Sequence, residues 1–421
     1  MNFFSTPVTR RQFMKYSLRT LAGLAADTIL TPLSEVFASP YGEPDMRFPR
    51  QIVAGDNMHG RTIMWQSNKN GRDVHAVWRE AGTSAEHRVE ATADYFVDDG
   101  TALILHTSQI TGLTPGKQYE YRIMEGKKAS SWYPLKTDDG TRCKAIIASD
   151  SQCEDGYITW RRIALAASLR NHDADLFLLL GDLVDNGESS QHWDDWFTAM
   201  DGIQEHLPLA PLVGNHETYD LNWNFRWPYA YLNYFDVPGN GSSEFPRFYY
   251  SFDYGPVHFI MLSTVWHELN SFKTGIIQEQ ADWMRRDIKA STKPWNVVCM
   301  HRDIYNYDVR PPKFSDVGLR YMPLFDELGI DAVLDGHIHS YRRRDHIYDF
   351  KNSKRKGPIY INTGLSGDCR YYNLPQAPLD EVMASQPETD NYLTMEATRR
   401  TLSFTCYLPS GVDIDHIILH K

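Results

Sequence analysis

Five short apolar runs in the second part of the chain each end at residues that commonly bind metals. The runs occupy residues 144–149, 176–180, 208–213, 296–300 and 332–335. They stop at Asp150, Gly181-Asp182, Gly214-Asn215-His216-Glu217, His301 and Gly336-His337-Ile338-His339. Apolar runs of this length predict strands that are buried on both faces. Because open α/β sheets place their ligands at the carboxyl ends of the strands, we expect these side chains to meet at one edge.

The first part of the chain has a different pattern. Residues 62–67, 76–80 and 117–123 alternate between apolar and polar side chains, which predicts half-buried strands. Pro115-Gly116 marks a turn before the last of these. Short strands separated by turns over residues 46–138 predict a small all-β sandwich.

From about residue 142 onward, predicted strands alternate with predicted helices. Residues 157–171 and 274–290 have helical apolar spacing, with Trp283 and Met284 facing inward. A hairpin is expected around Gly255-Pro256, and residues 411–419 predict a closing strand. The polar segment 366–396, which contains prolines, receives no assignment.

Length and charge narrow the classes of function. A chain of 421 residues has room for two or three domains. The formal charge of −11 argues against nonspecific binding of a nucleic-acid backbone, and no nucleic-acid-recognition motif is present. A small phosphate ester remains compatible, because a metal pair supplies local positive charge. The five cysteines are scattered without CxxC spacing and identify no disulfide.

The N-terminus has the features of an export signal. Residues 9–15, Thr-Arg-Arg-Gln-Phe-Met-Lys, resemble the twin-arginine motif. A modest apolar stretch follows, and residues 36–38 offer small-residue cleavage spacing. We therefore predict a signal peptide over residues 1–38 and export to the periplasm or the cell exterior. The alternative is that this N-terminal segment is an ordinary basic amphipathic helix that is not cleaved from the protein. No segment is long and apolar enough to predict a membrane span.

Both parts of the chain resemble known families. Met64-Trp65-Gln66 and residues 110–116, 119–122 and 131–137 resemble the fibronectin-type-III-like N-terminal domain of purple acid phosphatases. The five blocks, taken in order, resemble the calcineurin-like metallophosphoesterase superfamily in its purple-acid-phosphatase-like branch. The resemblance implies a β-sandwich over residues 46–138, followed by a four-layer α/β/β/α domain over residues 142–421.

The resemblance also implies a binuclear metal site. It assigns Asp182 as the bridging ligand, Asp150 and His339 to the first metal, and Asn215, His301 and His337 to the second. His216 would face the substrate and stabilise or protonate the leaving oxygen. We expect Glu217 to orient His216 or a metal-bound imidazole. Nitrogen and oxygen ligands without thiolate suit two divalent or mixed-valence ions of Fe, Zn or Mn.

Two positions depart from the related families. Purple acid phosphatases have a metal-binding tyrosine in a GDxxY block, where this chain has Asp185. This departure brings the tyrosinate into question and matches the wider superfamily, which includes phosphodiesterases. The wider superfamily often has a DxH block, where this chain has Gln152. A carboxamide oxygen is a weaker, neutral ligand, and we leave open whether Gln152 binds the metal.

Substrate selection is expected to lie in the loops between the blocks. Aromatic residues of 218–246 and 302–320, together with Arg302, would suit an organophosphate pocket or pack an interface. Arg342-Arg343-Arg344 would attract anions or, as we favour, form a solvated loop.

We conclude that the sequence predicts an exported metal-dependent hydrolase of small phosphate esters. A metal-bound hydroxide would attack the ester, with Asp182 and His216 as the catalytic residues. A phosphomonoesterase is favoured by the N-terminal domain, and a phosphodiesterase is the alternative that Asp185 favours. A surface-binding module with a decayed catalytic domain is the alternative from another class. The oligomeric state is not predicted.

Overall fold

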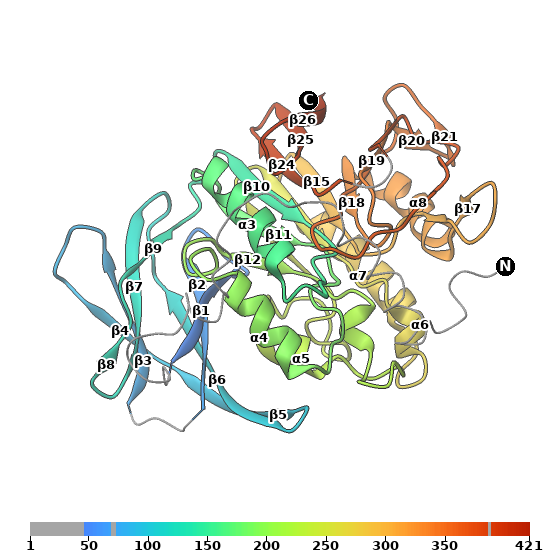
Figure 1. Ribbon diagram of the computed structural model, residues 1–421. Helices are drawn as coiled ribbons and strands as arrows, with labels where there is room; N and C mark the ends of the chain where they lie inside the picture. The colour runs from blue at the N-terminus through green and yellow to red at the C-terminus, as the bar shows by residue number, and fades with distance from the viewer. Residues whose placement is uncertain (1–45, 69–72, 386–388) are drawn as a thin grey trace, which may run out of the picture.

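The computed structural model describes residues 46–68, 73–385 and 389–421. The predicted signal peptide therefore lies outside the described residues. A ten-stranded and a seven-stranded sheet form the centre of the molecule, and a smaller sheet lies at one end (Figure 1). Among the described residues, no helix has the length and apolarity needed to cross a membrane.

The ten-stranded sheet runs through both parts of the chain. Its strands, in spatial order, are β26 (Asp413–His420), β25 (Thr401–Tyr407), β24 (Tyr392–Ala397), β10 (Cys143–Ala148), β11 (Leu176–Leu179), β12 (Leu209–Pro211), β1 (Arg47–Ile52), β2 (Gly60–Ser67), β6 (Thr101–Thr111) and β5 (Thr92–Asp98). β1 joins the two parts by pairing in parallel with β12 at Ile52 and Leu209. The domain division near residues 138–142 stays a prediction, since strand pairing crosses it.

The seven-stranded sheet carries the later metal-ligand blocks. Its strands, in spatial order, are β13 (Tyr250–Tyr254), β14 (Val257–Met261), β15 (Trp295–Cys299), β18 (Ala332–Asp335), β22 (Ile359–Asn362), β19 (Arg342–Arg344) and β23 (Val382–Met383). Two short hairpins lie outside these sheets: β16 (Tyr305–Asn306) with β17 (Lys313–Phe314), and β20 (Ile347–Tyr348) with β21 (Lys351–Asn352). The predicted hairpin around Gly255-Pro256 is confirmed by the pairing of β13 with β14.

Helices flank the two central sheets. They are α3 (Ile158–Arg170), α4 (Ser190–Ala199), α5 (Tyr229–Tyr234), α6 (Trp266–Leu269), α7 (Ile276–Ala290) and α8 (Asp316–Leu328), with a 3₁₀ turn, η1 (His216–Thr218). In α3, Trp160 packs on Phe177 of β11, and in α7, Asp287 contacts His258 of β14. The predicted helices at 157–171 and 274–290 are confirmed, with Trp283 and Met284 buried.

A second sheet completes the N-terminal sandwich. It contains β4 (His87–Glu90), β3 (Val74–Glu80), β7 (Gln118–Glu125) and β8 (Lys128–Ala129), and β9 (Tyr133–Lys136) pairs with β7. β7 alternates between buried and less buried residues as predicted. These strands pack on β2 and β6 around a separate small core that includes Trp65 and Tyr121. The predicted order of a β-sandwich followed by an α/β part is confirmed.

Two local predictions were wrong. β2 was expected to be half-buried, but all eight of its residues are buried, because one face covers the sandwich core and the other faces the larger core. Arg342 and Arg344 were expected in a solvated loop, but both are fully buried in β19. They share Asp380, and Arg344 also binds Asp303 at 2.7 Å. Charges of this kind are tolerated inside a protein only when they are paired.

Candidate metal centre

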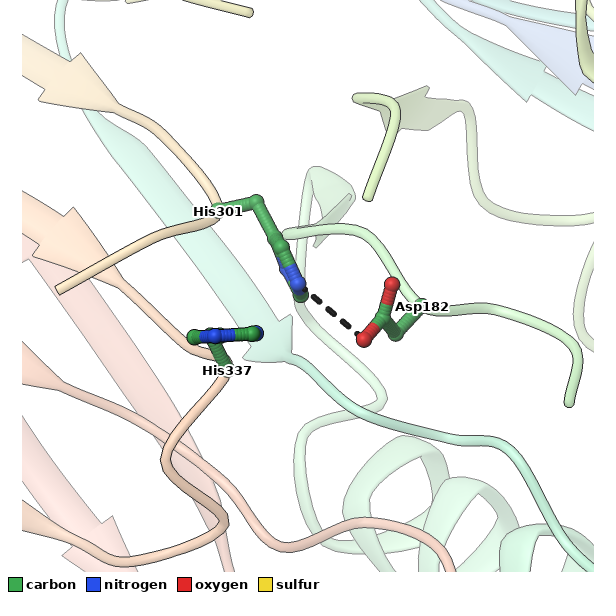
Figure 2. Close-up of side chains that lie close together, drawn as sticks. All are labelled: Asp182, His301 and His337. Atoms are coloured by element: carbon green, nitrogen blue, oxygen red, sulfur yellow. Dashed lines mark ion pairs between the residues drawn. The ribbon is translucent and has the colours of Figure 1, made fainter. Parts of the chain in front are cut away.

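The predicted metal ligands come together where the strands of the two central sheets end. Asp182 contributes to two compact groups of ligand atoms, and within each group the atoms lie within 4.8 Å of one another. Asp150, Asp182 and His339 form one group, the candidate first site, and Asp182, His301 and His337 form the other, the candidate second site. Figure 2 shows the second group, with the Asp182 carboxylate facing the imidazoles from a different loop. A carboxylate shared by both groups is placed to bridge two ions.

His301 and Asn215 lie side by side in the second site. Nε2 of His301 is 3.1 Å from Oδ2 of Asp182 and 3.1 Å from Oδ1 of Asn215. Nδ1 of the same ring donates to the carbonyl of Leu180 at 2.8 Å, which leaves the lone pair of neutral His301 on Nε2. A lone pair aimed at two oxygens is unfavourable unless a cation lies between them or the ring is protonated. The donor set therefore fits a metal ion.

His339 has the same arrangement in the first site. Its Nδ1 donates to the carbonyl of Cys369, and its Nε2 is 3.5 Å from Oδ1 of Asp150. The Gln152 amide nitrogen lies 3.2 Å from Nε2 of His339, while the Gln152 amide oxygen is buried without a hydrogen-bond partner. An amide rotated about its terminal bond would present that oxygen to an ion held by His339. This orphaned oxygen also fits a metal ion.

The backbone around the ligands is strained. Four candidate ligands have left-handed φ angles: 56° at Asp150, 51° at Asp182, 72° at His337 and 51° at His339. Each such residue other than glycine costs on the order of 1–3 kcal/mol, and such strain concentrates at functional sites. Gly214 approaches so closely that a Cβ there would meet Oδ1 of Asp182 at 2.2 Å. The loops are therefore shaped around the carboxylates.

Burial and neighbouring charges shift the pKa values of these groups. Burial raises the pKa of Asp150 to about 7. Burial would also raise the pKa of Asp182, but the adjacent imidazoles of His301 and His216 lower it below the usual range. Burial would lower the pKa of His301, but Asp182 raises it to about 9. Burial lowers the pKa of His339 to about 4, which keeps that ring neutral and able to bind a cation.

His216 lies beside the two groups and points toward a cavity. Its backbone N–H donates to Oδ1 of Asp182 at 2.8 Å, and its Nδ1 donates to the carbonyl of Asp185 at 2.6 Å. Its Nε2 is 3.9 Å from Oδ2 of Asp182. Burial would lower the pKa of His216, but the carboxylates of Asp182 and Asp185 raise it. The ring therefore lies beside the two groups of candidate ligands, and the neighbouring carboxylates favour its protonated form.

Glu217 does not have the expected role. It was predicted to orient His216 or an imidazole, but its carboxylate accepts backbone N–H groups of the two ligand loops. The N–H of Asp182 lies at 3.0 Å, that of Leu183 at 2.7 Å and that of Gly214 at 2.7 Å. Glu217 therefore holds the loop of Asp182 against the loop of Asn215.

A cavity of about 500 Å³ opens beside the metal groups. Its lining includes His216, Tyr219 and Trp223 together with Arg302, Asp303 and residues 305–308. Arg302 is fixed in this lining by a bidentate ion pair with Glu268. Of the aromatic residues predicted for the pocket, Trp227 and Tyr231 pack in the core instead.

The sequence interpretation missed Tyr371, which lines the cavity and lies in the unassigned segment 366–396. Its ring stacks on His339 with centroids 4.3 Å apart and planes at 11°. A signal was available, because residues 359–361 form another apolar run that ends at a polar residue, Asn362, in β22. All five cysteines are free, so the structure contains no disulfide in its described residues.

Comparisons with known proteins agree with this architecture. Residues 144–341 match the family described as calcineurin-like phosphoesterase, and residues 50–137 match the N-terminal domain of purple acid phosphatase. Probable purple acid phosphatase 20 of Arabidopsis thaliana is 30% identical over 348 residues, which cover 78% of this chain and 76% of that protein. Purple acid phosphatase 15 of the same plant is 26% identical over 307 residues, covering 64% of this chain and 54% of that protein.

The fold is also similar to a solved structure. Purple acid phosphatase PPD1 from yellow lupin seeds superimposes with a TM-score of 0.75 at 17% sequence identity, covering 89% of this chain and 74% of that protein. The chain spans between half and two thirds of the length of several curated relatives that it matches.

Proposed function

Because the chain belongs to the purple acid phosphatase family of metallophosphoesterases, we propose that it is an exported hydrolase of small phosphate esters, with monoesters as its preferred substrates. The observation that carries this proposal is the sharing of Asp182 between two groups of metal-ligand atoms. Asp150, Asp182 and His339 would hold the first ion, and Asp182, Asn215, His301 and His337 the second. Gln152 would join the first group after rotation of its amide.

The donor chemistry limits which ions fit. Imidazole, carboxylate and carboxamide groups without thiolate suit Fe, Zn or Mn. When bound, such a pair supplies an activated water and positive charge for the ester oxygens. The protein's own contribution is to fix these donors on rigid strand ends and to keep His339 neutral.

His216 would act on the leaving group. Because Nδ1 donates to the carbonyl of Asp185, Nε2 carries a proton toward the cavity in the imidazolium form, which the raised pKa of His216 favours. Transfer of that proton to the leaving oxygen avoids release of a free alkoxide. Arg302, held by Glu268, would place a fixed positive charge in the cavity wall beside His337.

A phosphodiesterase is the second candidate. Asp185 stands where the related phosphatases have tyrosine, and the cavity of about 500 Å³ has room for a second ester group. The two candidates are separated by assaying one metal-loaded preparation with 4-nitrophenyl phosphate and bis(4-nitrophenyl) phosphate. We expect a higher kcat/KM for the monoester, and the opposite order would favour the diesterase.

Export is a separate part of the proposal and is supported by residues 9–15. Replacing both Arg10 and Arg11 with lysine keeps the charge but removes the arginine pair. We expect the full chain to leave the cytoplasm in a host with twin-arginine transport, and the variant to remain inside. Equal export of both forms would contradict this route.

A further inference from the structure

The segment that follows β22 wraps around the first metal site. Gly364 lies so close to Asp150 that a Cβ on this glycine would meet the Asp150 Oδ2 at 2.8 Å. The backbone N–H of Ser366 donates to the carbonyl of Ser149 at 3.3 Å. A Cβ on Gly367 would meet the carbonyl oxygen of Gln152 at 2.0 Å. The segment and the loop of Asp150 therefore fit together without space for side chains at two positions.

Asp368 fixes the far end of that same loop. Its carboxylate accepts the backbone N–H of Glu154 at 3.0 Å and that of Asp155 at 3.0 Å. These bonds hold the turn that follows Gln152. Because Asp150 and Gln152 precede this turn directly, their side chains are oriented by a segment more than two hundred positions away in the sequence.

The next residues of the segment hold His339. The carbonyl of Cys369 accepts a hydrogen bond from Nδ1 of His339. This bond fixes the tautomer with the proton on Nδ1 and leaves the lone pair of Nε2 to bind a cation. Tyr371 covers one face of the ring with near-parallel planes, 4.3 Å between centroids. A hydrogen bond at the edge and a stacked ring on the face together leave His339 little freedom to rotate.

From these contacts we propose that Tyr371 and Asp368 are positioning residues for the first metal site: Tyr371 for the ring of His339 and Asp368 for the loop of Asp150 and Gln152. The inference rests on the proposed binuclear function. It adds a segment outside the five ligand blocks that sets the affinity of one of the two ions. We expect its effect to be selective, since the contacts described above hold Asp150, Gln152 and His339, all at the first site.

The chain offers matched variants for a test. Tyr371→Ala removes the stacked ring, whereas Tyr371→Phe keeps it. Tyr372→Ala is the control, because Tyr372 is the next residue, is also a tyrosine and is 65% exposed. Asp368→Asn tests the second contact, since an amide nitrogen placed opposite an N–H group cannot accept its proton.

The measurement is Zn²⁺ binding to metal-free protein by competition with a chromogenic chelator. For Tyr371→Ala and Asp368→Asn we expect one of the two binding steps to weaken about 10-fold to 100-fold, as is typical when a residue that orients a ligand is removed. The other step should stay within about 2-fold of the unmodified protein, and Tyr371→Phe and Tyr372→Ala should leave both steps unchanged. Thermal unfolding of each metal-free variant, followed by circular dichroism, shows whether the fold is retained.

Two results would overturn the inference. One is unchanged Zn²⁺ binding in both Tyr371→Ala and Asp368→Asn. The other is an equal weakening of both steps without loss of fold, because it would show that the segment does not act on the first site selectively. Failure of the proposed function looks different: the unmodified protein would bind fewer than two Zn²⁺ ions and would turn over neither ester.

Discussion

At the scale of single residues, one carboxylate of the candidate site, that of Asp182, contacts several of the other site residues. The Asp182 carboxylate receives the backbone N–H of His216 and faces both His301 and His216. His216 follows Asn215 directly but faces the cavity, so neighbouring residues of one block have different tasks. The candidate ligands would hold ions, whereas His216 would act on the leaving group. Substitutions in the two sets of residues should therefore have different effects.

Replacing His216 with glutamine should slow turnover without removing metal. We expect kcat for an alkyl phosphate to fall by about 100-fold or more, since general-acid catalysis contributes about 10²–10⁴-fold. The fall should be smaller for 4-nitrophenyl phosphate, whose leaving group needs no proton. Steady-state kinetics with both esters and metal analysis of the same sample provide the check. An equal fall for both esters would contradict the assigned role.

Glu217→Gln should destabilise the metal-free protein. The carboxylate accepts hydrogen bonds from backbone N–H groups of both ligand loops. In the glutamine variant, the amide NH₂ would face one of these N–H groups and could not accept its hydrogen bond. We expect a loss of about 1–3 kcal/mol in the free energy of unfolding, the cost of leaving buried donors unsatisfied. Urea unfolding measures it. Glu188→Gln is the control, because that side chain is 25% exposed, and a similar loss there would argue against a special role for Glu217.

At the scale of elements, the sequence predicted features that depend on local patterns better than features that depend on contacts between distant segments. The apolar runs at β10, β11, β15 and β18 and the helices α3 and α7 were predictable because their burial shows directly in the sequence. The full burial of β2 was not, because its two faces are covered by two different cores built from distant parts of the chain. Arg342 and Arg344 are buried because Asp303 and Asp380 meet them from distant segments.

Strand β14 and helix α7 are joined by a titratable contact that can be tested. His258 donates to Asp253 at 2.7 Å and to Asp287 at 2.9 Å. Burial would lower the pKa of His258, but these two carboxylates raise it to about 9. A raised pKa means that the ion pair stabilises the fold fully below pH 6.5, and that this contribution is lost as the pH rises through 9.

Substituting His258 with glutamine should therefore cost more stability at pH 6 than at pH 10. We expect a difference of about 2 kcal/mol between the two pH values, allowing for the partial exposure of Asp253. Urea unfolding at both pH values measures it. His59→Gln serves as control, since His59 pairs with Asp56 at the surface and its side chain is 53% exposed. A cost for His258→Gln that is independent of pH would contradict the assigned charge.

At the scale of the whole molecule, the continuous sheet couples the two parts of the chain. β1 pairs with β2 on one side and β12 on the other, and Phe48 of β1 stacks on Phe197 of α4 at 5.3 Å. The buried guanidinium of Arg50 donates to the carbonyl of Tyr234 at 2.9 Å. These contacts are of the kind found inside one core rather than between independently moving domains.

Hydrogen exchange tests this coupling. We expect the amides of β2 and of β10 to exchange through the same cooperative opening, with free energies within about 1 kcal/mol of each other. Mass spectrometry of exchanged peptides at increasing urea would resolve the two strands. Opening of β2 at a much lower free energy, while β10 remains protected, would show that the parts unfold separately.

The most direct test of the account is the number of metal ions bound per chain, measured on the same preparation as ester turnover. We predict two ions, loss of at least one in Asp182→Asn together with a collapse of turnover, and two ions retained in Asp185→Asn, whose carboxylate lies outside both ligand groups. Fewer than one ion per chain with turnover intact, or full metal content and activity in Asp182→Asn, would contradict the binuclear site.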